Sequence, residues 1–135
     1  MPMTVTEHEL AAHAAKTKGL RIAEADLEAA IFSIHTFTAR HGVLGELASD
    51  GVKATEYERR AAHPSLSLLT IAVLVLRNGF TVTGESACAD PAMFDAEIGK
   101  RLAIADAKRK VWSLLGYALR DRMHDIRSLH AAIDS

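Results

Sequence analysis

SLLTIAVLVLRNGFTVT, residues 67–83, combines an apolar run, a turn signal and an alternating segment, and it decides the fold. Residues 67–76 are rich in Leu, Val and Ile, which favour β-strands. Asn78-Gly79 is the dipeptide preferred in two-residue type I′ turns, and residues 80–83 alternate as a returning strand does. The stretch therefore predicts an antiparallel β-hairpin.

The first strand of this hairpin is apolar on both faces. A sheet of two or three strands in a small chain then needs a cover on each face. We expect one of the two covers to come from another subunit. The two faces consist of Leu68, Ala72, Leu74 and Leu76 on one side and Leu69, Ile71, Val73 and Val75 on the other.

A long helical region is predicted after the hairpin, over residues 91–133. Asp90 is suited to the N-cap position and Pro91 to the first helical position. From Phe94 to Ile133, apolar residues recur at steps of three, four or seven, which predicts one apolar stripe. An unbroken helix would be about 64 Å long at about 1.5 Å per residue. Either Gly116 breaks it or the helix is shared with a partner chain.

Shorter elements are predicted before the hairpin. Residues 4–18 carry a capping-box spacing ahead of an alanine-rich run, and 23–30 also favour a helix. The β-branched and aromatic residues of 31–38 indicate a strand. Residues 39–64 show no steady period, so a long loop or insertion is expected there. A functional flap, a short helix of unknown position and a mobile loop all remain open for this segment.

The size and these elements predict one domain over residues 1–135. Its fold class is α+β. We expect a small antiparallel sheet, built on the β-hairpin and packed on a long C-terminal helix, with short N-terminal helices.

Composition excludes several classes of protein. Sixteen Lys and Arg against seventeen Asp and Glu give a formal net charge of −1, so no overall field attracts nucleic acid or an anionic membrane. The longest apolar run, residues 68–76, is too short to span a bilayer. The N-terminus has acidic residues and no apolar block, and the single Cys88 cannot form an internal disulfide. A cytoplasmic protein is expected.

Basic residues interrupt the predicted apolar stripe, whose centre runs through Phe94 and Trp112. At about 100° per residue, Arg101 and Lys108 lie within about 40° of this line, and Arg109 lies about 60° to its other side. In one interpretation these long side chains run along the core and reach water. In the other, their charged ends meet an anion or a carboxylate near the hairpin, because an unpaired buried charge is costly.

Residues near the hairpin could complete a pocket around these charges. Phe80 offers an aromatic face for stacking a base, and Asp90 could accept a hydrogen bond from a ligand. Backbone N–H groups at a helix start favour negative charge. The ordinary alternatives are that Phe80 belongs to the core and that Asp90 is only a helix cap.

Motifs for catalysis or metal binding are absent from the sequence. His8 and His13 are five residues apart, and His124 and His130 are six apart, so neither pair has the i, i+4 spacing of helical ligands. Cys88 has His35 and Asp90 as conceivable companions, but one cysteine with a distant histidine is a common coincidence, and the small residues around Cys88 indicate buried packing. There is no GxGxxG, GxxxxGK[ST] or GxSxG motif. The basic cluster at 108–110 is too small to indicate nucleic-acid binding. We expect no catalytic activity, metal or cofactor.

The sequence resembles a family of small phage and prophage proteins named after gene products forty-nine and sixty-six of two enterobacterial phages. The resemblance covers about residues 66–122, with a weaker one over 24–38. The segment 39–64 and the tail after Met123 look like additions to the family pattern. The residues that carry the resemblance are LVLRNGFTVTGESAC at 74–88, Phe94-Asp95, Glu97-Ile98-Gly99, Trp112, Gly116-Tyr117 and Leu119.

We expect this family to be related to the first Thoeris anti-defence family. Those phage proteins sequester a cyclic ADP-ribose immune signal without cleaving it, and they hold the ligand between subunits. The resemblance implies that a ligand stacks on Phe80 and makes a polar contact at Asp90, a position where the family often has Asn. A family arginine is replaced by Ile104 here, so the basic contacts fall to Arg101, Lys108 or Arg109.

The sequence therefore leads to two hypotheses about function. In the first, a homo-oligomeric phage protein binds and sequesters a cyclic nucleotide immune signal, with no role for nucleic acid or membranes. In the second, the chain is a protein-protein interaction module of phage origin without a small-molecule ligand. The candidate ligand-binding residues are Phe80, Asp90, Arg101, Lys108, Arg109 and Asn78.

Overall fold

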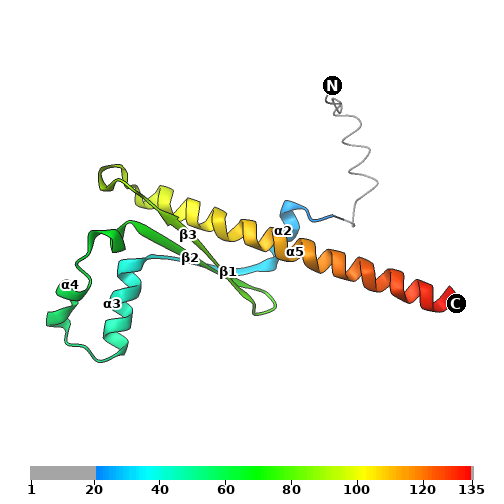
Figure 1. The fold of residues 1–135 in the computed structure, drawn as a ribbon, viewed down its shortest axis with the longest axis horizontal. Coiled ribbons are helices and arrows are strands. Elements are labelled where there is room, and N and C mark those ends of the chain that lie inside the picture. The colour runs from blue at the N-terminus through cyan, green and yellow to red at the C-terminus, as the bar shows by residue number, and fades with distance from the viewer. Residues whose placement is uncertain (1–20, 135) are drawn as a thin grey trace, which may run out of the picture.

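A computed structural model describes residues 21–134, so the helix predicted over 4–18 lies outside the described part of the chain. Three antiparallel strands in the order β1-β2-β3 form a sheet, and the long helix α5 lies across one face of it (Figure 1). The predicted α+β class is confirmed. The elements are α2 (Glu24–Ala30), β1 (Ile31–Thr38), α3 (Ala39–Ser49), η1 (Ala54–Glu56), α4 (Tyr57–Arg60), η2 (Pro64–Ser67), β2 (Leu69–Leu76), β3 (Thr81–Ala87), η3 (Pro91–Met93) and α5 (Ala96–Asp134).

The core lies between the sheet and α5. Strand β2 is central, and Ala72 pairs with Thr36 on β1 and with Gly84 on β3. Side chains of β2 alternate between the two faces, as a strand requires. The buried cluster consists of Leu27, Ile31, Ala72, Leu74, Leu76, Val82, Ala103, Ala107 and Val111.

Small residues form the side of α5 that faces the sheet. Gly99, Ala103, Ala107 and Val111, spaced by four, are its buried residues. Strand β3 approaches so closely that a Cβ added at Gly84 would lie 2.1 Å from the carbonyl oxygen of Ala103. Large side chains have no room there, because protein interiors are close-packed.

The predicted apolar stripe therefore does not face the core. Ile98 and Leu102 are 52% and 55% exposed, and Trp112 also lies at the surface. The large apolar residues of α5 predicted the wrong side of the helix. Because β3 lies so close to α5, only small residues fit on the side that faces the sheet. The apolar stripe of the first half of α5 is an outer surface.

The two apolar faces predicted for the first hairpin strand are confirmed. Ala72, Leu74 and Leu76 are buried under α5. The opposite row, Leu69, Ile71, Val73 and Val75, is half-buried, and the strands beside it place His35 and Thr83 next to Val73. Helix α5 covers only one face of the sheet (Figure 1). A cover from another subunit stays a prediction.

The hairpin forms as predicted, but its turn differs. The N–H of Gly79 donates to the carbonyl of Leu76 at 2.9 Å, and the N–H of Leu76 donates to the carbonyl of Phe80 at 2.8 Å. Gly79 has φ 90, and no non-glycine residue of 21–134 has positive φ. A type I′ turn would need positive φ at Asn78 as well, so the connection is a three-residue loop with glycine in the left-handed position.

Helix α5 starts later than predicted and does not break. Asp90 caps the short η3, where its Oδ1 accepts from the N–H of Ala92 at 3.0 Å. Asp95 caps α5 instead, and its Oδ1 accepts from the N–H groups of Glu97 and Ile98. The helix then continues through Gly116 to Asp134 as 39 residues. Its length is about 58 Å at about 1.5 Å per residue.

The expectation of a long loop over residues 39–64 is wrong, and the alternative of a short helix in this segment is confirmed. Helix α3 occupies Ala39–Ser49, and Thr38 caps it by accepting from the N–H of His41 at 3.3 Å. Arg40 links α3 to the segment around α4, since its guanidinium donates to the carbonyl of Ala61 and to the carboxylate of Glu58, both at 2.8 Å. This helix could not be predicted from the sequence, because its residues include glycines and mixed charges and form no clear apolar face.

Side chains of α5 cover the outer edge of β3. The carboxylate of Asp106 accepts from the N–H of Glu85 at 2.9 Å, and the ammonium of Lys110 donates to the carbonyl of Thr83 at 2.6 Å. The backbone hydrogen bond from Glu85, followed by the bond from Arg109, lowers the pKa of Asp106 below its ordinary value of 3.8. The charged form of Asp106 therefore helps to hold β3 against α5.

Asp106→Asn is expected to lower the urea midpoint of unfolding near neutral pH. Because folding lowers the pKa of Asp106, its contribution is present above the unfolded pKa and is lost as pH falls through the folded pKa. The difference between wild type and variant should therefore shrink as the pH falls from neutral through 3.8, the ordinary pKa of an aspartate, and below it. Asp121→Asn, on the exposed part of α5, is the control and should leave the midpoint unchanged. A difference that stays constant over this range would contradict the assignment.

Candidate functional site

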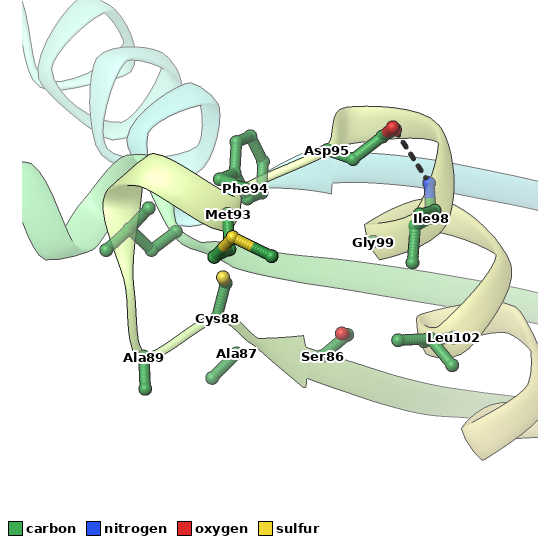
Figure 2. A pocket seen from close by; sticks show the side chains of 11 residues that line it. Ser86, Ala87, Cys88, Ala89, Met93, Phe94, Asp95, Ile98, Gly99 and Leu102 are labelled. Atoms are coloured by element: carbon green, nitrogen blue, oxygen red, sulfur yellow. Dashed lines mark hydrogen bonds between the residues drawn. The ribbon is translucent and has the colours of Figure 1, made fainter.

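A cleft lies where the end of β3 meets the start of α5 (Figure 2). Its volume is about 280 Å³, and it opens to solvent. The strand supplies one wall, the η3 segment closes the end, and the first turns of α5 supply the other wall. The lining residues are Leu68, Ser86, Ala87, Cys88, Ala89, Met93, Phe94, Asp95, Ile98, Gly99 and Leu102.

The polar groups of this cleft are mostly occupied. The thiol of Cys88 donates to the carbonyl of Asp90 at 3.1 Å. The carboxylate of Asp95 turns back to the N–H of Ile98, as the dashed line in Figure 2 shows. Figure 2 also shows the sulfur atoms of Met93 and Cys88 on the same side of the cleft, with the ring of Phe94 above them. The walls therefore suit a flat or apolar group better than a charged one.

The structure separates the two residues predicted to contact a base and its polar groups. Phe80 is 55% exposed at the hairpin tip, next to Asn78, whose Oδ1 accepts from the N–H of Phe80 at 3.0 Å. Asp90 lies beyond the other end of β3. Seven strand residues at about 3.3 Å each separate these positions by roughly 23 Å. One chain alone does not bring Phe80 and Asp90 to one site.

Two of the three predicted cations are paired within the chain. The ammonium of Lys108 lies 2.8 Å from the carboxylate of Glu28 on α2. The guanidinium of Arg109 lies 2.7 Å from Asp106, one turn earlier on α5. The companion expected for Lys108 is thus a carboxylate of its own chain.

Arg101 differs from the other two cations. It is exposed and forms no ion pair with any residue in 21–134. It shares one turn of α5 with Ile98 and Leu102, which line the cleft. Of the predicted basic residues, Arg101 is the one whose charge is available beside a cavity.

The chain matches one known protein family over most of its length. The Phage protein (N4 Gp49/phage Sf6 gene 66) family matches residues 22–123, about three quarters of the sequence. The chain belongs to this family. The family match includes residues 39–64, which had looked like an addition, and α5 continues to Asp134 beyond its end. No curated protein and no solved structure matches the chain.

The cleft of this phage family member was missed by sequence reasoning. The sequence predicted no site at Cys88 or Met93, although both residues line the cavity. The cleft could have been found from the small residues Gly99, Ala103 and Ala107, because their spacing of four marks the side of the helix that faces the sheet. With that side assigned to the sheet, Ile98 and Leu102 would be expected on the outer side of the helix, where they line the cleft.

Within residues 21–134, no three His, Cys, Asp or Glu side chains are grouped so that they could hold a metal ion. No helix in the same range is both long and apolar enough to cross a membrane.

Proposed function

We propose that this phage protein binds and sequesters a cyclic nucleotide immune signal of the cyclic ADP-ribose type, and counters host defence without catalysis. The resemblance to the first Thoeris anti-defence family supports the ligand class. The observation that carries the proposal is the pairing of an available guanidinium, Arg101, with an open apolar cleft of about 280 Å³.

A nucleotide has two parts that match these two features. Its base is flat and apolar on its faces, and the cleft offers Phe94 and Met93 as contact surfaces. Its pyrophosphate is anionic, and an arginine can bind such a group through two parallel hydrogen bonds. The nearby carboxylates of Asp90 and Asp95 accept from backbone N–H groups of their own segments and keep their negative charge, so the guanidinium of Arg101 has to outweigh their repulsion of phosphate.

In a homo-oligomer, Phe80 could contact a ligand in the cleft although it lies far from the cleft of its own chain. Because Phe80 lies roughly 23 Å along the strand from Asp90, it reaches a cleft only on another copy of the chain. An exposed aromatic ring at a hairpin tip is well placed to close such a site from outside. Each composite site then uses Arg101 of one copy and Phe80 of a second.

The second candidate function is a protein-protein interaction module without a small-molecule ligand. The exposed outer stripe of α5, with Ile98, Leu102 and Trp112, favours it. Contiguous exposed apolar residues are typical of protein interaction sites. In that case the cleft is part of a larger docking surface for a host or phage protein.

Calorimetry with cyclic ADP-ribose isomers and cyclic oligonucleotides tests the first function. Arg101→Ala is expected to weaken binding about 10-fold to 100-fold, the usual loss for a charge-assisted hydrogen bond. Arg120→Ala, an exposed change farther along α5, is the matched control and should bind like wild type. No heat with any of these ligands at high micromolar concentration would sink the proposal.

Mixing two defective variants tests the composite site. Arg101→Ala and Phe80→Ser should each bind weakly alone. A mixed oligomer of the two contains one site with both residues intact, so mixing should restore part of the binding capacity. If mixing restores nothing while both variants remain folded and oligomeric, Arg101 and Phe80 do not share a site between copies.

A further inference from the structure

The second half of α5 extends beyond the sheet (Figure 1). Residues 115–134, called here the distal segment, carry an apolar row that the rest of residues 21–134 leaves largely exposed. Ile126, Leu129 and Ile133 are 54%, 60% and 70% exposed. The family match ends at residue 123, so these three residues lie outside the matched range.

The spacing in the distal segment is that of a coiled-coil seam. Apolar residues at alternating steps of three and four repeat every 3.5 residues on average, which keeps one side of a helix against a partner helix. One position of the seam is occupied by a charge, Arg122. The apolar members are Leu115, Leu119, Ile126, Leu129 and Ile133.

This seam continues a side of α5 that is already packed. At about 100° per residue, Ile104 and Lys108 lie on the same side as Leu115. Ile104 and Leu115 pack against the core, and Lys108 meets Glu28 of α2. Beyond Leu115 the sheet and α2 end while the apolar side goes on, so the distal segment lacks a neighbour there among residues 21–134.

We propose that the distal segment pairs antiparallel with the distal segment of a second copy. The charge at Arg122 selects the direction. In a parallel, in-register pair, Arg122 would face Arg122 of the partner subunit, and like charges at a seam position are repulsive. In an antiparallel pair that crosses at residue 124, Arg122 lies opposite Ile126 of the partner subunit and next to Asp125 of the partner subunit, and the symmetry repeats this ion pair.

The same register aligns the apolar residues. Leu119 meets Leu129 of the partner subunit, and Leu115 meets Ile133 of the partner subunit. Space for this last contact exists, because a shallow pocket of about 190 Å³ lies beside Leu115, between Ala30 and Leu76. The end of the partner helix would thus pack on the end of the core.

This pairing rests on α5 alone and does not depend on the ligand. It brings the hairpin tip near Ile133 of the partner subunit and not near Arg101 of the partner subunit, so the composite site proposed above needs a different contact between copies. Failure of nucleotide binding would leave it intact, and a wild-type chain that is monomeric by light scattering would overturn it. Leu129→Glu should convert the dimer into monomer, whereas Leu114→Glu, on another side of α5, should not. If both variants stay dimeric, the seam is not the interface.

Cysteine cross-linking tests the direction. In a Cys88→Ser background, which keeps a hydrogen-bond donor at that position, we would prepare Leu119→Cys and Leu129→Cys separately. Mild oxidation of the mixture should give a covalent dimer, while each variant alone should not. A covalent dimer from either variant alone would show a parallel pair and overturn the proposal, as would the absence of any cross-link in the mixture.

Charge reversal tests the ion pairs. Arg122→Glu or Asp125→Arg alone places like charges together in the antiparallel pair and should weaken dimerisation several-fold. The double variant exchanges the two charges and should recover most of the loss. Loss in the double variant equal to the sum of the single losses would contradict the proposed contact.

Discussion

Gly84→Val is expected to abolish the native fold, and Gly84→Ala to destabilise it by at least about 3 kcal/mol, the upper end of the usual cost of overpacking a core. A Cβ at this position would lie 2.1 Å from the carbonyl oxygen of Ala103 and 2.4 Å from the backbone nitrogen of Ala107. Both neighbours are helix backbone, which cannot rotate away as a side chain can. Strand β3 and α5 would have to separate, which would open the core above Ala72.

Urea unfolding followed by far-ultraviolet circular dichroism measures this effect. Gly116→Ala is the matched control, because nothing lies within 4 Å of a Cβ added there. That change should raise the free energy of unfolding by about 0.5–1 kcal/mol, since alanine favours the helix interior over glycine. A Gly84→Ala variant as stable as wild type would mean that β3 and α5 do not pack as described.

Leu74→Ala is expected to lower the free energy of unfolding by about 2–5 kcal/mol, the range for emptying a buried leucine site. Leu74 has 0% exposure and lies at the centre of β2, between Ile34 on β1 and Val82 on β3. Its neighbours belong to three strands and α5, so the space left behind cannot close easily.

The same urea experiment checks this prediction against Leu114→Ala. Leu114 is 38% exposed on α5, and its replacement should change the free energy of unfolding by no more than about 0.5 kcal/mol. Equal effects of the two substitutions would contradict the described core.

The elements of the sheet could be predicted because their signals are local. The strand expected at 31–38 is β1 with the same bounds, and the helix expected at 23–30 is α2 within one residue. Branched and aromatic residues favour strands wherever they are placed in the chain. The hairpin was also found from its own residues, although the turn type depended on the backbone angle of Asn78, which Asn-Gly alone does not fix.

The side of α5 that faces the sheet could not be predicted in the same way. Hydrophobic size pointed to Ile98, Leu102 and Trp112, yet the distance between β3 and α5 is set by Gly84. That glycine and the helix residues it meets are about twenty positions apart in the sequence. A close contact of this kind selects small residues on both partners, and periodicity of large residues does not reveal it.

The candidate site shows the same limit. The residue types of Phe80, Asp90 and Arg101 each suit contact with a nucleotide, but the distances between them depend on the direction of β3. The strand carries Phe80 and Asp90 to opposite ends of the sheet. The partner of Lys108 was also out of reach of a sequence pattern, since Glu28 comes from α2, 80 residues earlier. The partner of Arg109, in contrast, is Asp106, three residues earlier on the same helix, a spacing that the sequence does show. A residue type suggests chemistry, and only the fold tells which residues meet.

The two edges of the sheet differ in one respect with a consequence for growth of fibrils. Asp106 and Lys110 already occupy backbone groups of β3 at Glu85 and Thr83. Along residues 31–37 of β1, no side chain from residues 21–134 makes equivalent bonds to the backbone. A fibril that grows by strand pairing needs two sheet edges with unpaired backbone groups on every molecule. With one border blocked by its own helix, this sheet can accept a single neighbour and then stops.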